Sequence, residues 1–109
     1  MVAHNKTLKG INALVMGLGL HGGGVATAKW LLNEGAVVTA TDKRSSEVLA
    51  PSLRALRGKK VAYVLGEHRK SDFRSHDLVV VNPGVPRESE YLVVAKKAKK
   101  RIENDTSLF

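Results

Sequence analysis

The strongest constraint on the fold is a glycine-rich segment, Gly17-Leu18-Gly19-Leu20-His21-Gly22, which directly follows a short apolar run at Asn12–Met16. The run is typical of a buried β-strand, and apolar residues recur near the helical period over residues 22–34. A strand, a Gly-x-Gly-x-x-Gly turn and a helix in succession can hold a phosphate group at the helix N-terminus. We therefore predict a phosphate-binding turn here, with a tight turn that binds no ligand as the alternative.

The rest of the chain continues the alternation of β-branched apolar runs and helical patterns. We predict further strands at 36–41, 61–65 and 78–81, a strand opening at Ile102, a helix over 51–57, and a helix whose apolar stripe is Tyr91, Val94, Ala95 and Ala98. Because consecutive strand–helix–strand units form right-handed crossovers, this alternation predicts an α/β fold. We expect a Rossmann-like three-layer domain with a parallel sheet of about five strands in the order 3-2-1-4-5.

Composition limits the remaining possibilities. At 109 residues the chain is one domain, and 43% hydrophobic residues are enough for a core. The absence of cysteine excludes disulfides, thiolate metal sites and cysteine nucleophiles, and it fits a cytoplasmic protein. No apolar run approaches the ~18 residues of a membrane span, and no secretory signal is apparent. The net charge of +8 favours anionic ligands of unspecified class.

The loops after the predicted strands are candidates for a binding site, since parallel strands share one carboxyl edge. Besides the glycine turn, these loops are Asp42–Arg44, Gly66–His68 and Asn82–Gly84. An acidic residue at the end of the second strand, such as Asp42, commonly contacts the ribose of a nucleotide. Lys43 and Arg44 follow it and suit an anionic group. Proline and a glycine able to take a positive φ should make Asn82-Pro83-Gly84 a rigid turn.

Several functions are not favoured by the sequence. No Gly-x-x-x-x-Gly-Lys-[Ser/Thr] motif occurs, so we do not expect the chain to hydrolyse ATP alone. His21, His68 and His76 do not form a recognised metal-ligand pattern, and we predict neither a metal site nor a catalytic residue. The basic run Lys96–Arg101 lies on the polar face of a helix, and only 5% of residues are aromatic. A nucleic-acid-binding module and the NAD-binding domain of an oxidoreductase stay open as alternatives.

Taken in order, these motifs resemble the N-terminal domain of Mur ligases, in the branch that joins D-glutamate to UDP-N-acetylmuramoyl-L-alanine (UDP-MurNAc-L-Ala). The resemblance spans almost the whole chain. It is carried by the glycine turn, by Asp42-x-Arg44, by the strand ending in Asn82-Pro83-Gly84, and by the C-terminal segment 102–109.

The resemblance implies that residues 1–109 form a single UDP-binding domain and that the central ATP-binding and C-terminal domains are absent. The full enzyme would then use ATP and magnesium to form an amide with D-glutamate in cytoplasmic peptidoglycan synthesis, whereas this fragment alone would be inactive. No membrane partner is expected.

The resemblance also implies a site. The Gly19-Leu20-His21 backbone would face the diphosphate, and Asp42–Arg44 would contact uracil and ribose. His21 departs from the family, which commonly has a hydroxyl residue there. The full set of expected UDP-binding residues is Gly17, Gly19, Leu20, His21, Gly22, Asp42, Lys43, Arg44, Asn82, Pro83 and Gly84.

Overall fold

The sheet has the topology that the sequence predicts. The computed structural model describes residues 8–19, 22–86 and 89–104. Its five strands are all parallel and lie in the order β3-β2-β1-β4-β5, which confirms the expected order. The elements are β1 (Asn12–Met16), α1 (Gly23–Asn33), β2 (Val37–Asp42), α2 (Ala50–Ala55), β3 (Val61–Leu65), α3 (Lys70–Ser75), β4 (Leu78–Val81), α4 (Glu90–Lys97) and β5 (Arg101–Asn104).

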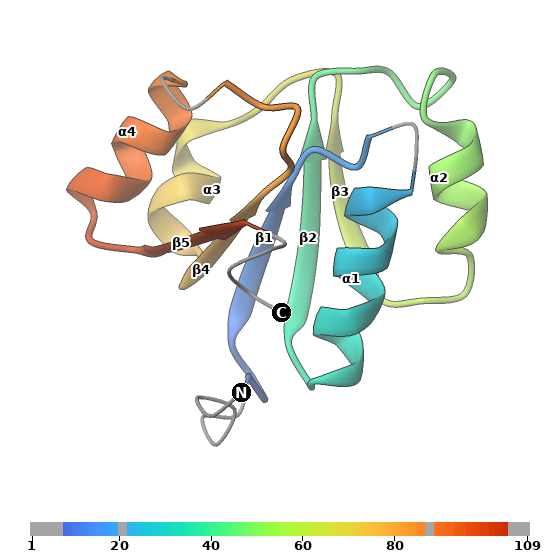
Figure 1. Ribbon diagram of the computed structural model, residues 1–109, viewed down its shortest axis with the longest axis horizontal. Coiled ribbons are helices and arrows are strands. Elements are labelled where there is room, and N and C mark those ends of the chain that lie inside the picture. The colour runs from blue at the N-terminus through green and yellow to red at the C-terminus, as the bar shows by residue number, and fades with distance from the viewer. Residues whose placement is uncertain (1–7, 20–21, 87–88, 105–109) are drawn as a thin grey trace.

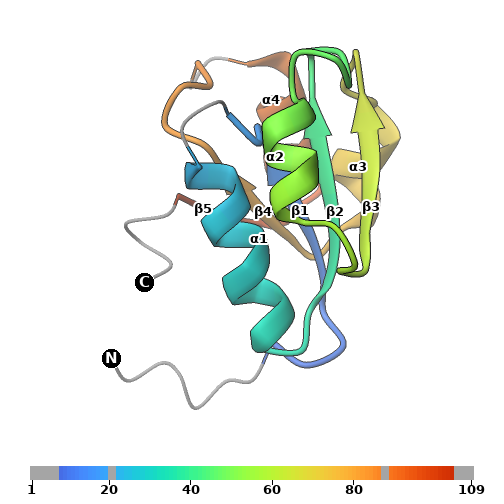
Figure 2. The ribbon, with the colours of Figure 1, turned by 90° about the vertical axis from the view of Figure 1, so that its right-hand side faces the viewer.

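The helices form a layer on each face of the sheet. Figures 1 and 2 show α1 and α2 on one face and α3 and α4 on the other. The loops that follow β1, β2, β3 and β4 all lie along the upper edge of the sheet in Figure 1. This is the carboxyl edge, so the topology brings the predicted loops together.

The hydrophobic core is divided by the sheet, because successive side chains of a strand point to opposite faces. On β1, Ala13 and Val15 pack in the cluster that includes residues of α1, whereas Leu14 and Met16 pack in the cluster that includes residues of α3 and α4. All these side chains are buried. Burial on both faces explains why β1 reads as a continuous apolar run.

The end of α1 shows how local sequence fixes an element boundary. Gly35 has a φ of +88° and follows the last turn of the helix. Its N–H donates to the Leu32 carbonyl, and the Ala36 N–H donates to the Leu31 carbonyl, which is the Schellman arrangement. The helix therefore stops where the glycine predicts that it should.

Helix α3 is an element that the sequence analysis did not predict. It spans six residues, and Phe73 is its only large apolar side chain. Two turns with one buried anchor produce no readable periodicity. Phe73 is fully buried between the sheet and α4, so tertiary packing stabilises the helix.

Strand β3 is less buried than its apolar sequence suggests. Within the part of the chain that the structure describes, it pairs only with β2, and Ala62 and Tyr63 are exposed. Its position at the edge of the sheet accounts for this exposure. Within the described ranges, no helix combines the length and the apolar content needed to cross a membrane.

Candidate functional site

The glycine turn after β1 is tight and closely packed. Gly17 has a φ of +94°, a region that side-chain-bearing residues avoid. A Cβ atom at this position would lie 2.9 Å from the Cβ of Asn82. Glycine is therefore required here both by backbone conformation and by the neighbouring turn after β4.

Gly24, in the first turn of α1, lets that helix approach the preceding turn. A Cβ atom on it would lie 2.5 Å from the Cα of Leu18. Its N–H donates to the Leu18 carbonyl at 3.1 Å. In the sequence motif this packing role belongs to the third glycine, Gly22, but a Cβ atom on Gly22 would meet nothing within 4 Å. The close approach is thus made two residues later.

Asp42 holds the glycine turn in place. Its Oδ2 atom accepts hydrogen bonds from the backbone N–H groups of Leu18 at 2.9 Å and Gly19 at 3.4 Å. Its Oδ1 atom accepts the N–H of Arg44 at 2.9 Å. The side chain of Asp42 is nearly buried, with 3% of the residue exposed. This structural role was not predicted from the sequence, which pointed only to a ligand contact.

Ser52 secures the same turn from α2. Its hydroxyl donates to the Gly19 carbonyl at 3.0 Å, and the residue is buried. Gly19 is therefore held through its N–H by Asp42 and through its carbonyl by Ser52. Nothing in the local sequence around Ser52 signals this contact, which joins residues 33 positions apart.

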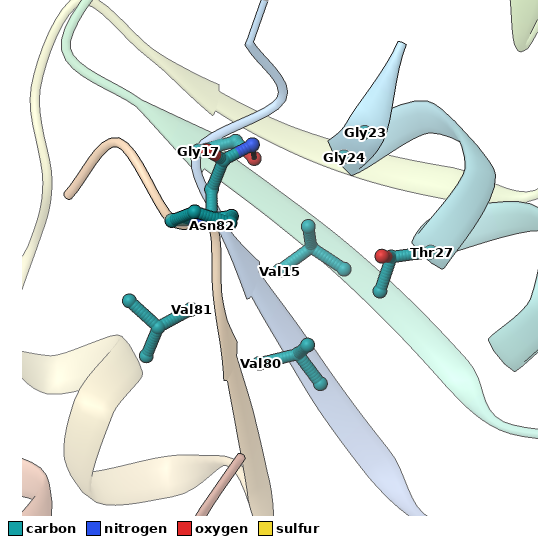
Figure 3. A pocket seen from close by; sticks show the side chains of 9 residues that line it. Val15, Gly17, Gly23, Gly24, Thr27, Val80, Val81 and Asn82 are labelled. Atoms are coloured by element: carbon teal, nitrogen blue, oxygen red, sulfur yellow. Dashed lines mark hydrogen bonds between the residues drawn. The ribbon is translucent and has the colours of Figure 1, made fainter. Parts of the chain in front are cut away.

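Asn82 joins the glycine turn to the turn after β4. Its side-chain amide donates to the Gly17 carbonyl at 3.3 Å, and its Oδ1 atom accepts the N–H of Gly84 at 2.9 Å. Figure 3 shows the Asn82 amide directed toward Gly17. Gly84 is not among the residues with positive φ, so the turn does not use the conformational freedom of this glycine. The Asn82 side chain shapes this turn instead.

A small hollow lies beneath these turns, between the N-terminus of α1 and the sheet (Figure 3). Its volume of about 10 Å³ has room for one water molecule at most. Val15, Thr27 and Val80 line it together with Pro83. Pro83 thus faces this hollow and does not line the larger cavity described next.

A cavity of about 350 Å³ opens at the carboxyl edge of the sheet, a size that suits a small organic ligand. It brings together segments that follow β1, β2, β3 and β4 with the start of α4. Its lining residues are Met16, Gly17, Gly19, Asp42, Lys43, Arg44, His68, Asn82, Gly84, Val85, Pro86, Ser89, Glu90 and Tyr91.

Most of the expected site residues meet in this cavity. Those that line it are Gly17, Gly19, Asp42, Lys43, Arg44, Asn82 and Gly84. Gly22 and Pro83 do not. Leu20 and His21 lie outside the described residues.

The start of α4 contributes lining residues that the sequence analysis did not assign to the site. Tyr91 was expected in the apolar stripe of its helix, but it is only half-buried and lines the cavity. Leu92, the next residue, takes the buried position. The shift reflects where α4 docks, which helical periodicity alone does not determine.

His68 forms part of the inner wall of the cavity. Its Nδ1 atom lies 2.8 Å from the hydroxyl oxygen of Thr41, and its ring makes edge contacts with Tyr91 and Phe73 at centroid distances of 5.2 and 6.1 Å. Burial, followed by the nearby charge of Lys43, lowers the pKa of His68 below its ordinary value of 6.5, against an opposing effect of Asp42. The shift favours the neutral form of the imidazole.

The lysine-rich end of α4 lies apart from this cavity. Lys96, Lys97 and Lys99 are exposed, as expected for the polar face of the helix. Of the cationic residues, Lys43 and Arg44 line the cavity, and the side chain of Arg44 is 47% exposed beside Asp42. Positive charge is thus available at the rim of the site, where it suits an anionic ligand.

Residues 11–103 match the family described as "Mur ligase MurD-like, N-terminal domain". A UDP-N-acetylmuramoylalanine–D-glutamate ligase from Roseiflexus sp. (strain RS-1) is 50% identical over 102 residues, which are 94% of this chain and 22% of the relative. The corresponding ligase from Borreliella burgdorferi (strain ZS7) is 49% identical over 104 residues, with the same coverage of both chains. The chain thus spans about a fifth of the length of these relatives.

Solved structures show the same fold at low sequence identity. A pseudomurein peptide ligase type C from Methanothermus fervidus superposes with a TM-score of 0.63 at 19% identity, covering 90% of this chain and 20% of that one. The A chain of dipicolinate synthase from Bacillus subtilis gives a TM-score of 0.60 at 17% identity, covering 93% and 40%. At these identities the likeness concerns the fold alone.

Proposed function

Because this chain belongs to the family of MurD-like N-terminal domains of Mur ligases, we propose that it binds the UDP part of UDP-MurNAc-L-Ala. The observation that carries the proposal is the 350 Å³ cavity beside the glycine turn. It lies at the carboxyl edge of a parallel sheet, where α/β domains bind nucleotides. A nucleoside fits its volume, and the turn beside it leads to the N-terminus of α1, which favours a diphosphate.

Different residues contact different parts of the nucleotide. The Gly19-Leu20-His21 backbone and the start of α1 take the diphosphate, with Lys43 and Arg44 supplying positive charge at the rim. Asp42 and Gly84 border the nucleoside. Since the Leu18 and Gly19 N–H groups already donate to Asp42, the diphosphate relies on backbone donors further along the turn.

In the full-length ligase, this domain would hold the substrate while other domains perform the chemistry. With magnesium, ATP would transfer its γ-phosphoryl group to the substrate carboxylate and leave as ADP, and the amine of D-glutamate would then attack the acyl phosphate and displace phosphate to form the amide. The described residues contain no cluster of three or more His, Asp or Glu side chains suited to a metal. By its likeness to the family, the full-length enzyme would bind ATP, magnesium and D-glutamate in its remaining domains and act in cytoplasmic peptidoglycan synthesis.

Calorimetric titration of the 109-residue chain with UDP, UDP-MurNAc-L-Ala and NAD tests the proposal. We expect both uridine nucleotides to bind and NAD to give no comparable heat. Tight binding of NAD with no response to uridine nucleotides would reject the proposal in favour of an oxidoreductase domain. Strong, salt-dependent binding of DNA in their place would indicate a nucleic-acid module.

A pair of glycine variants localises the binding. Gly19 and Gly58 have φ values of +74° and +81°, so valine strains the backbone at both positions. Only Gly19 lines the cavity, and its added side chain would approach Asn82. Gly19→Val should therefore lose UDP binding, whereas folded Gly58→Val should retain it. Equal affinities would place the nucleotide elsewhere.

A further inference from the structure

The inner wall of the cavity holds a histidine with a defined hydrogen-bonding arrangement. His68 follows β3 and is 9% exposed, Thr41 lies at the end of β2 and is fully buried, and Tyr91 lies on α4. Thr41 and His68 are 27 residues apart; Thr41 lies in β2, and His68 lies shortly after the neighbouring strand β3. His68 and Tyr91 line the cavity, with ring centroids 5.2 Å apart and ring planes at 70° to each other, so this wall presents aromatic rings to a ligand.

The contacts of Thr41 determine which nitrogen of His68 carries the proton. The Thr41 hydroxyl donates to the backbone carbonyl of Glu67 at 3.3 Å, and its oxygen lies 2.8 Å from the Nδ1 atom of His68. A hydroxyl has one hydrogen, and a carbonyl oxygen can only accept. Both contacts are hydrogen bonds at once only if Nδ1 is protonated and donates to Thr41.

The other ring nitrogen is left with a lone pair. In a neutral imidazole with a proton on Nδ1, the Nε2 atom is an acceptor. No residue in the described part of the chain donates to Nε2, and no side-chain nitrogen or oxygen there is both buried and without a partner. The Nε2 atom is therefore not fully buried, and its residue lines the cavity.

We propose that His68 is a specificity-determining residue of the nucleoside site and that its Nε2 atom accepts a hydrogen bond from the N3–H of uracil. This inference rests on the proposed binding of UDP. The imide N3–H is the hydrogen-bond donor on the Watson–Crick edge of uracil. Cytosine instead has a lone pair on N3. This lone pair would face the lone pair of His68 Nε2, and the two would repel each other. Thr41 fixes the tautomer and thereby selects uracil over cytosine.

Two variants of His68 separate the roles of its nitrogens. Asparagine can place an amide N–H near the position of Nδ1 and so keep the bond to Thr41, but it has no atom at the position of Nε2. Glutamine is longer and can place its amide oxygen near that position. We expect His68→Asn to weaken UDP binding about tenfold and His68→Gln to restore part of it.

Modified ligands test the donor. Wild-type protein should bind 3-methyl-UDP and CDP at least about tenfold more weakly than UDP. In His68→Asn, the affinities for UDP and 3-methyl-UDP should differ by only about twofold. As a control, the ratio of wild-type affinity to His68→Asn affinity should be the same for 2′-deoxy-UDP as for UDP. If the 2′-deoxy change, and not the N3-methyl change, abolishes the effect of His68, then the donor is the ribose and the proposal is wrong.

The outcomes distinguish this inference from the proposed function. Wild-type protein that binds UDP but does not discriminate against 3-methyl-UDP overturns the role of His68 and leaves UDP binding intact. Protein that binds no uridine nucleotide overturns both. Independently of any ligand, imidazole ¹⁵N chemical shifts should show a protonated Nδ1 and an unprotonated Nε2 in His68. The opposite tautomer would also overturn the role.

Discussion

The Oδ2 atom of Asp42, at the end of β2, lies 2.9 Å from the backbone nitrogen of Leu18 in the turn after β1. The carboxylate also accepts the backbone N–H of Arg44 through its Oδ1 atom. The acidic residue that the sequence associates with a ribose therefore also builds the turn that would hold the phosphates. Both carboxylate oxygens accept hydrogen bonds from backbone N–H groups. Replacing Asp42 should therefore change the stability of the fold as well as ligand binding.

Asp42→Asn should destabilise the protein by about 2 kcal/mol, because an amide has one oxygen for two groups of N–H donors and its NH₂ must face one of them. Urea denaturation followed by circular dichroism measures this change. Asp77→Asn is the matched control, since among the described residues that carboxylate accepts only an exposed contact from the Asn12 N–H at 3.3 Å. The control should change stability by less than about 0.5 kcal/mol. Equal effects would show that the Asp42 contacts contribute little.

Ser52→Ala should cost about 1 kcal/mol and weaken UDP binding several-fold, because the Gly19 carbonyl loses its hydrogen bond and the turn loses one anchor. Ser75→Ala, whose hydroxyl makes a 3.4 Å contact with the Asp72 carbonyl in α3, is the control. It should leave UDP affinity unchanged in the same titration. A Ser52→Ala variant with wild-type affinity would mean that the turn keeps its shape without this anchor.

Gly24→Ala should destabilise the fold by about 2–3 kcal/mol, because the new methyl group would meet the backbone of Gly17 and Leu18 and neither can move alone. Gly23→Ala provides the comparison at the preceding position. Its methyl group would lie 3.8 Å from the Asn82 amide nitrogen, and alanine favours the helix, so stability should stay within about 0.5 kcal/mol. Thermal unfolding of both variants decides whether the close approach occurs at residue 24.

Lys99→Gly should stabilise the protein by about 0.5–1 kcal/mol. Lys99 ends α4 with a φ of +60°, and it occupies the Schellman position, where its N–H donates to the Lys96 carbonyl. Glycine adopts this conformation without the steric cost that lysine carries. The same substitution at Lys96, inside the helix, should instead destabilise the protein by about 0.5–1 kcal/mol, and the denaturant midpoints of the two variants should shift in opposite directions.

Stability should fall as the pH is lowered below about 6.5, and His68 should account for part of the slope. Burial and Lys43 lower the pKa of His68 in the folded state, although Asp42 opposes them, and the rings of Tyr91 and Phe73 pack against the imidazole. The unfolded chain therefore binds the proton more readily, and acid favours unfolding until the folded-state pKa is passed.

His68→Asn removes this titration, so its stability should depend less steeply on pH below about 6.5 than that of wild type. Denaturation curves at several pH values give both slopes. A variant that loses stability with acid as steeply as wild type would show that His68 is not protonated more easily on unfolding.

The family and the arrangement of strands were predictable from the chain itself. Apolar runs such as Asn12–Met16 and Leu78–Val81 indicate strands because burial on both faces leaves no polar positions, and the glycine segment fixes the strand–turn–helix unit. Right-handed crossovers then leave few possible strand orders, and the observed order is the expected one. The comparisons confirm the Mur ligase resemblance over residues 11–103.

The partners of individual side chains were decided only by the tertiary structure. Asp42 with Leu18, Ser52 with Gly19, and Thr41 with His68 are contacts between residues 24 to 33 positions apart. Tyr91 reaches the cavity because of the way α4 docks, and α3 forms because Phe73 is buried. Periodicity and propensity report interactions between near neighbours in the chain. The direction in which a side chain points at the carboxyl edge depends on how distant segments pack, and local sequence carries no record of that.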